Sequence, residues 1–266
     1  MLEDPEDIAN VIADHLEDIY EHSNAVGSIS GERFNLIDNQ FNNDITMEEL
    51  FWAIDQGKGH SVGPDQIGYP MLQHLPYRTK RKFLELINQV WETGPVPQEW
   101  KDGIIITIPK PGKDPKILGN QRPITLMSCV GKILERIINR RLIQTIEANQ
   151  LLDARQYAFR QLVILDINKA YDTISTEAIV RQLKQWGFSG RILNYINDFV
   201  RGRSFKVAVG GNFSNRRQNA NGVPQGSIIA VTLFMIGMKS IFKEVPKKCP
   251  CIFVCRRYSF ASIRKQ

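Results

Sequence analysis

Apolar residues recur at the three- and four-residue spacing of an amphipathic helix in six segments of the chain. These segments are residues 4–20, 46–55, 80–91, 132–146, 176–186 and 191–200. Thr46 and Glu49 form a predicted capping box at the start of the second segment. Ser175 and Ser189 are predicted N-caps of the last two helices, and Gly187 is a predicted stop between them.

Three other segments have the pattern of strands. Residues 104–108 are short and β-branched, residues 162–165 form the continuous apolar run of a buried strand, and apolar residues alternate at 205, 207 and 209. Gly210 and Gly211 follow this alternation and predict a hairpin turn. We interpret the polar, asparagine-rich residues 23–43 as a linker. Because strands and helices are mixed without a regular βαβ rhythm, the sequence predicts an α+β fold.

The composition is that of an ordinary globular protein, with 42% apolar and 23% charged residues over 266 positions. No run approaches the roughly twenty apolar residues that span a bilayer. The acidic start MLEDPEDIAN is the opposite of the basic start of a signal peptide. We therefore expect an intracellular protein, in the nucleus or the cytoplasm, without a membrane partner.

Charge is distributed unevenly along the chain. Residues 1–50 hold 13 acidic side chains against one arginine, whereas residues 51–266 hold 33 lysines and arginines against 15 acidic side chains. A basic body suits a polyanionic partner, because cations that neutralise phosphates release condensed counterions. A generally basic, solvated surface is the alternative reading of the same charges.

The four cysteines do not have the spacing of a zinc site. Cys249, Cys251 and Cys255 cluster near the C-terminus without a nearby histidine, and Cys129 stands alone. Structural zinc sites use four ligands, usually as paired CxxC or histidine motifs. We therefore expect no zinc.

Two segments carry the strongest indications of chemistry. LVILDINKAYD, residues 162–172, places Asp166 at the end of an apolar run, and NGVPQGS, residues 221–227, is a glycine-flanked Pro-Gln turn. A carboxylate beside an apolar strand costs several kcal/mol unless a cation or hydrogen bonds compensate it, and a divalent metal would do so. Alternatively, Asp166 ends the strand and accepts backbone N–H bonds. The two glycines allow a close backbone approach, and Gln225 offers an amide for base or sugar contacts.

Together these segments resemble the palm motifs of reverse transcriptases, closest to those of non-LTR (LINE-type, jockey- and I-element-like) retrotransposons. The resemblance implies a right-hand polymerase with Mg²⁺ as cofactor, and an RNA template, a DNA primer and deoxynucleoside triphosphates as partners. It implies that Asp166 is the catalytic metal-binding carboxylate, with the Ile167 carbonyl as an additional ligand. Tyr171 would exclude a ribose 2′-OH. Gly222, Pro224, Gln225 and Gly226 would contact template or primer, and Gln225 also the nucleotide.

Upstream, IIITIPKPGKDP and NQRPITL resemble the fingers of the same enzymes. The resemblance implies that Lys110 and Arg122 hold the incoming triphosphate, arginine as a bidentate fork and lysine as a point charge. As solvated surface cations they would need no such role. The Trp100–Lys101 pair and the GPD at residues 63–65 also match the family, whereas Gln121 replaces an aromatic residue that often precedes RPI.

The resemblance divides the chain into four parts. Residues 1–45 form an acidic helix and linker, residues 46–160 a fingers-like region, residues 161–253 a partial palm, and residues 254–266 a tail that we interpret as out of frame. We expect fingers and part of the palm, without a thumb. The oligomeric state cannot be read from the sequence.

The sequence departs from the family pattern at two places. Arg160 is followed almost directly by the metal-binding strand, where family members have some tens of residues more. Later, CIFVCRRYSF stands where a strand ending in Tyr-Ala-Asp-Asp is expected. Residues 254–259, Val-Cys-Arg-Arg-Tyr-Ser, can be written GTA TGC CGA CGA TAT TCN, and a start one nucleotide later reads Tyr-Ala-Asp-Asp-Ile. We hypothesise a frameshift at or before Val254, which other codons in the nucleotide sequence would refute. A genuine basic tail is the alternative.

The second departure has a chemical consequence. Two-metal phosphoryl transfer needs ions roughly 3.5–4 Å apart that carboxylates bridge. Asp166 without a partner pair supplies too little charge, Asp172 belongs to the following turn, and Arg256 and Arg257 would repel the metals. We therefore expect no polymerisation by this polypeptide. The alternatives are a non-catalytic nucleic-acid-binding module, or the product of a decayed element without a stable fold.

Overall fold

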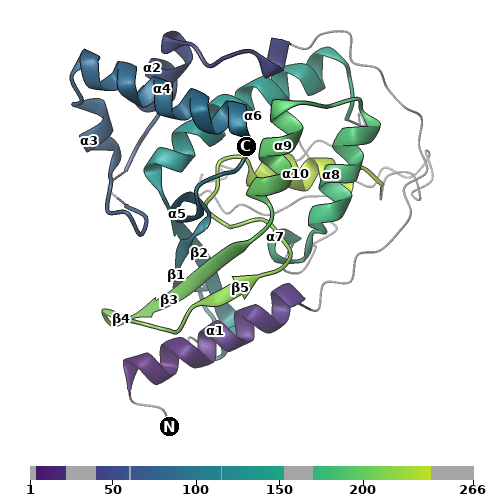
Figure 1. Ribbon diagram of the computed structural model, residues 1–266. Coiled ribbons are helices and arrows are strands. Elements are labelled where there is room, and N and C mark those ends of the chain that lie inside the picture. Colours follow the sequence, from purple (N-terminus) through teal and green to yellow (C-terminus); the bar gives the residue numbers. More distant parts are fainter. Residues whose placement is uncertain (1–3, 22–39, 60, 115, 153–169, 241–266) are drawn as a thin grey trace, which may run out of the picture.

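The computed structural model describes residues 4–21, 40–59, 61–114, 116–152 and 170–240 (Figure 1). These residues form a layer of helices above a small twisted sheet, with one helix crossing the far side of the sheet (Figure 1). The expected mixture of helices and strands is confirmed. Within the described ranges, no helix has the length and apolar character needed to cross a bilayer.

Helices and strands alternate irregularly along the chain. The helices are α1 (Pro5–Glu21), α2 (Met47–Asp55), α3 (Tyr69–Gln73), α4 (Tyr77–Thr93), α5 (Gln98–Lys101), α6 (Cys129–Ala148), α7 (Ala170–Thr173), α8 (Thr176–Gln185), α9 (Arg191–Phe199) and α10 (Ala230–Gly237). The strands are β1 (Gly103–Pro109), β2 (Gln121–Met127), β3 (Arg203–Val209), β4 (Asn212–Phe213) and β5 (Arg217–Asn219). Short 3₁₀ turns lie at Gln40–Asn42, Leu118–Asn120 and Met238–Ser240.

The sheet has the order β2-β1-β3-β4 among the described residues, and β5 also pairs with β3. β1 and β2 form an antiparallel hairpin, whereas β1 and β3 run parallel. Ile105 points to the α1 side of the sheet, so alternation places Ile104, Ile106 and Ile108 on the opposite face. Among the described residues β2 is the edge strand of the sheet.

The helical layer encloses the main hydrophobic core. α6 runs through its centre and buries an apolar face that includes Ile133, Leu134 and Ile138, each with no exposed surface. Trp91 of α4 and Tyr195 of α9 pack against each other with ring centroids 6.1 Å apart. The helical periodicity of the sequence is thus confirmed for α1, α2, α4, α6, α8 and α9, because each turns its apolar positions inward.

α1 covers the other side of the sheet with a second, smaller cluster. Its apolar face, which includes Leu16 and Tyr20, packs against Ile105, Phe205 and Val207. Arg217 of β5 is paired with two acidic side chains of α1: Asp14 at 2.6 Å and Glu17 at 3.3 Å. Two acidic residues of the N-terminal segment therefore pair with one of the protein's own arginines.

The ends of the helices confirm most of the predicted signals. Thr46 and Glu49 make both bonds of the capping box, and Ser175 Oγ accepts from the Ala178 N–H at 3.2 Å. Gly187 follows α8 with φ +89°, as a helix stop requires. The prediction for Ser189 is wrong: the N-cap of α9 is Gly190, at φ +69°, and the first turn is capped from a distance by Asn42, whose Oδ1 accepts from the Ile192 N–H at 3.0 Å.

The linker expected at residues 23–43 is wrong for its last residues. Phe41 is 5% exposed and belongs to the main core, where its ring lies 5.2 Å from that of Phe188. The Asn43 carbonyl accepts a hydrogen bond from the Trp91 indole at 3.0 Å. The burial of Phe41 could not be predicted from the sequence, because a single phenylalanine among asparagines forms no periodic apolar pattern. The strand expected at residues 162–165 and the tail at 254–266 lie outside the described residues.

Candidate functional site

The loop of residues 221–227 lies between α7 and the outer edge of β2. On the α7 side, the Val223 N–H donates to the Tyr171 carbonyl at 2.7 Å, and the Gly222 N–H donates to the Ile174 carbonyl at 3.0 Å. On the strand side, the Thr125 N–H donates to the Gln225 carbonyl at 2.8 Å. The loop therefore continues the sheet by one hydrogen bond and joins it to α7.

Its two glycines are required by the protein's own backbone. Gly222 has φ +82°, and a Cβ there would lie 2.6 Å from the Asp172 carbonyl oxygen. Gly226 has φ +143°, and a Cβ there would overlap the carbonyl oxygen of Thr125. These contacts account for both glycines without a ligand. The roles of Gly222, Gly226 and the buried Pro224 toward template or primer stay predictions.

A buried carboxylate holds the C-terminal end of the loop, at Ser227 and Ile228. Glu135 of α6 is 1% exposed, and its Oε2 accepts bonds from the Ser227 hydroxyl at 2.6 Å and the Ile228 N–H at 2.8 Å. Arg203 of β3 is also buried, and burial lowers the pKa of its guanidinium to about 10, although the charge of Glu135 opposes this shift. Sequence reasoning missed both residues, since each occupies an ordinary position in its own helix or strand.

A second buried carboxylate, Asp172, holds the side chain of Gln225 within the loop, and it is 3% exposed. Gln225 Nε2 donates to the two carboxylate oxygens at 3.1 and 3.4 Å. The hydroxyl of Tyr20 in α1 hydrogen-bonds to the same carboxylate. The expected place of Asp172 in a turn is refined to the short helix α7, where its carboxylate is enclosed by protein partners.

The β1–β2 hairpin carries both cations expected to hold a triphosphate. Arg122 pairs with Ile108, and the Lys110 N–H donates to the Asn120 carbonyl at 2.8 Å, so the ladder continues past the end of β1. Both cations therefore lie on the face opposite α1, beside the 44% exposed Ile108. Lys110 Nζ donates to the Gly119 carbonyl at 2.8 Å. Their role toward a nucleotide stays a prediction.

The remaining predicted site residues divide into two groups. Tyr171 lies in α7 with its ring 5.4 Å from that of Phe234. Asp166 and Ile167 lie outside the described residues. In the described part of the chain, no three histidine, cysteine, aspartate or glutamate side chains lie close enough together to hold a metal ion.

The GPD and WK positions make structural contacts. Asp65 Oδ2 accepts a bond from the Ser128 hydroxyl at 2.5 Å, and this couples the GPD turn to the start of α6. Trp100 packs over Gly131, where an added Cβ would lie 3.1 Å from its Cβ. Lys101 is 8% exposed and pairs with Asp198 at 3.2 Å.

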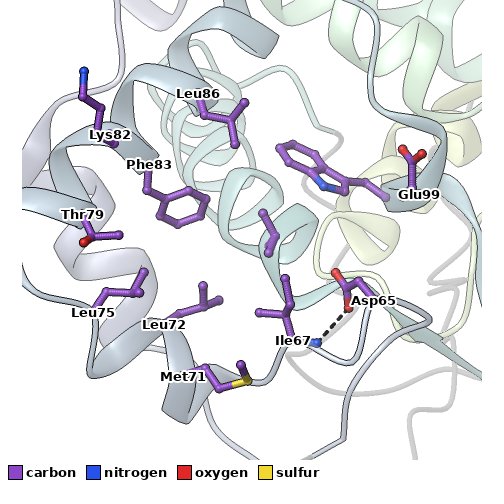
Figure 2. Close-up of a pocket in the computed structure, with 12 residues that line it drawn as sticks. Asp65, Ile67, Met71, Leu72, Leu75, Thr79, Lys82, Phe83, Leu86 and Glu99 are labelled. Carbon is purple, nitrogen blue, oxygen red and sulfur yellow. Dashed lines mark hydrogen bonds between the residues drawn. The ribbon is translucent and has the colours of Figure 1, made fainter.

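An apolar groove of about 560 Å³ lies apart from these motifs, between α3, α4 and α5 (Figure 2). Phe83 and Leu86 of α4 point into it from one side, and Met71 and Leu72 of α3 from another (Figure 2). Neither the loop 221–227 nor the cations of the hairpin line it. The groove offers apolar surface and no convergent set of titratable groups.

Comparison with known proteins assigns this arrangement to a family. Residues 108–259, more than half of the chain, match the family described as reverse transcriptase (RNA-dependent DNA polymerase). The chain belongs to that family, and its relatives are polymerases of non-LTR retrotransposons.

Three relatives illustrate the extent of the similarity. The RNA-directed DNA polymerase from mobile element jockey of Drosophila melanogaster is 28% identical over 65% of this chain and 22% of its own length. The probable RNA-directed DNA polymerase from transposon BS of the same species is 25% identical over 87% and 29%. The Pol polyprotein of the type-1 retrotransposable element R2 of Popillia japonica is 29% identical over 71% and 29%. The chain thus spans under a third of the length of these relatives.

Proposed function

We propose that the described residues form fingers and part of the palm of an RNA-directed DNA polymerase of the non-LTR type. The observation that carries this proposal is the convergence of three segments far apart in sequence. The loop 221–227 bonds to Thr125 in β2 and to Tyr171 in α7, and β2 begins with the Gln121–Arg122 pair. Such a junction suits a surface that contacts template, primer and nucleotide together.

In this proposal each predicted residue has a distinct role. Lys110 and Arg122 hold the triphosphate of an incoming deoxynucleotide, because cations on one face of a hairpin can grip phosphate oxygens. Tyr171 excludes a ribose 2′-OH, and Gln225 contacts the nucleic acid or the nucleotide. Asp166, with the Ile167 carbonyl, is the proposed ligand of Mg²⁺.

The described carboxylates near the loop do not fit a two-metal centre. Asp172 is enclosed by Gln225 and Tyr20, and Glu135 is occupied by Ser227 and Ile228. Magnesium would supply charge neutralisation at the triphosphate, and it needs near-octahedral oxygen ligands. Arg256 and Arg257 stand where the family pattern has aspartates. We therefore propose that this polypeptide binds nucleic acid but does not extend a primer.

The test measures binding and extension on the same sample. A labelled DNA primer annealed to an RNA template is titrated with the purified chain at several salt concentrations, and then deoxynucleotides and Mg²⁺ are added. We expect the logarithm of the affinity to fall linearly with the logarithm of the salt concentration, because lysines and arginines of the protein release counterions from the phosphates. We expect no extended primer. Arg122→Gln should weaken nucleotide binding, whereas Lys58→Gln, on an exposed loop, is the control.

Two outcomes would overturn parts of the proposal. Primer extension that disappears in Asp166→Ala would show that the polypeptide polymerises after all. Absence of salt-dependent binding by a chain that melts cooperatively would contradict the nucleic-acid surface itself. A chain without a cooperative transition would favour the decayed-element reading.

A further inference from the structure

The orientation of the Gln225 amide is set by Asp172. A carboxylate can only accept hydrogen bonds, so the amide must direct its NH₂ group toward Asp172, at 3.1 and 3.4 Å from the two oxygens. The carbonyl oxygen of the amide, Oε1, then points away from that carboxylate. Among the described residues, no hydrogen bond occupies this Oε1, and Gln225 is half-buried at the surface of the loop.

Asp172 is in turn held by Tyr20 at the end of α1. The Tyr20 hydroxyl bonds to the carboxylate, and burial, together with the charge of Asp172, raises the pKa of Tyr20 well above its ordinary value. The hydroxyl therefore stays protonated and remains a donor. The Tyr20 ring packs edge-on against Phe205 with centroids 5.6 Å apart, which fixes its position.

α1 also touches the loop directly. The Tyr20 carbonyl accepts a bond from Asn221 Nδ2 at 3.1 Å. One residue of α1 thus contacts both the start of the loop and the carboxylate that orients Gln225. α1 precedes the part of the chain that matches the reverse transcriptase family, residues 108–259.

We propose that Tyr20 and Asp172 are positioning residues that turn Oε1 of Gln225 toward the bound nucleic acid, where it accepts a hydrogen bond from a sugar hydroxyl. This inference rests on the proposed function. A surface that copies any sequence must make its constant contacts to groups present on every nucleotide, and sugar hydroxyls meet that condition. Two sources offer this donor: the 2′-OH of an RNA template and the 3′-OH of an incoming nucleotide.

Two conservative variants remove the orientation without removing Gln225. Tyr20→Phe deletes only the hydroxyl. Asp172→Asn replaces the carboxylate by an amide that can donate as well as accept, so Gln225 is no longer restricted to one orientation. The matched control is Tyr69→Phe, which deletes a partly buried hydroxyl that accepts from Arg136 at 3.0 Å and lies outside the loop.

The experiment compares ligands that differ by one hydroxyl. In one arm, the affinity for a DNA primer on an RNA template is divided by the affinity for the same primer on a DNA template. In the other arm, a deoxynucleoside triphosphate is compared with its dideoxy analogue, with the primer–template already bound. The expected preference of the unmodified chain is roughly threefold to tenfold in the arm that supplies the donor. Tyr20→Phe and Asp172→Asn should bring that ratio close to one, and Tyr69→Phe should leave it unchanged.

A spectroscopic measurement keeps the proposal testable if a variant does not fold. In the unmodified chain with ¹⁵N-labelled glutamine, the Gln225 side-chain amide is assigned by its loss in Gln225→Ala. One of its two protons should be shifted downfield and exchange slowly with water, as a bond to a carboxylate requires. A freely exchanging amide would overturn the proposal.

Equal affinity for both ligands of each pair, in an unmodified chain that binds nucleic acid, would also overturn it. So would a preference that persists in both folded variants. These outcomes differ from a failure of the proposed function, in which salt-dependent binding itself would be absent.

Discussion

The capping box of α2 and the side-chain bonds of the loop 221–227 join residues at very different separations along the chain, although Glu49 also has a distant partner in Arg141, 92 residues away. In α2, the capping box joins Thr46 to Glu49, three residues away. In the loop, Ser227 bonds to Glu135 and Gln225 to Asp172, which lie 92 and 53 residues away. A helix end is therefore determined by adjacent residues, whereas the shape of the loop exists only once α6, α7 and β2 have come together.

The largest effect is expected where the loop meets β2. Gly226→Ala should destabilise the protein by at least about 3 kcal/mol, because an alanine at φ +143° is strained and its Cβ would overlap the carbonyl oxygen of Thr125. Chemical denaturation gives the change in the free energy of unfolding. The control is Gly211→Ala, at φ +87° with no atom within 4 Å, which should cost only about 1–2 kcal/mol. Equal losses in the two variants would show that backbone strain alone, without the close approach, sets the cost.

A smaller effect is expected at Glu135, which binds the C-terminal end of the loop. Glu135→Gln should destabilise the protein by about 2–3 kcal/mol, since a neutral amide oxygen accepts the bonds from Ser227 and Ile228 more weakly than the charged Oε2 does, and Arg203 loses a nearby charge. Glu147→Gln, an exposed position on the same helix, should stay within about 0.5 kcal/mol. If the two variants unfold at the same denaturant concentration, Glu135 does not hold the loop.

The same contrast explains what could be predicted from the sequence. α4 and α6 have strong 3.6-residue periodicity over four or more turns, and their bounds were expected to within a few residues. The loop was singled out as NGVPQGS, but only through its resemblance to a family motif. Its conformation depends on carbonyl groups of Tyr171, Ile174 and the strand residue Thr125, which leave no pattern in the sequence.

β2 shows why other elements were not predicted. Its sequence QRPITLM contains a proline and begins with polar residues, so it lacks a clear strand pattern. Pro123 is tolerated because β2 is the edge strand among the residues that the structure describes. α10 was missed for a different reason: it is apolar on nearly all sides and has no polar face to give a period.

The smallest effect is expected in α2, and it should depend on pH. Glu49 bonds to Arg141 at 2.6 and 2.7 Å; although burial opposes ionisation, these bonds and those from Thr46 lower the pKa of the carboxyl below 4.5. Because the folded pKa lies below the unfolded one, the stabilisation is present above about pH 4.5 and is lost as the pH falls through the folded pKa. Glu49→Gln keeps a capping-box residue but removes the charge, so it should cost about 1 kcal/mol at neutral pH and progressively less in acid.

Thermal melts of both proteins from pH 3 to 7 would measure this convergence, since the two curves should meet at the acidic end. The neighbouring Glu48→Gln is the control, because Glu48 is exposed in the same first turn of α2 and has no hydrogen-bond or ion-pair partner among the described side chains. Its difference from the unmodified protein should be small at every pH. A Glu49→Gln difference that stayed constant across the range would mean that the side chain acts through packing and not through the charge that it places beside Arg141.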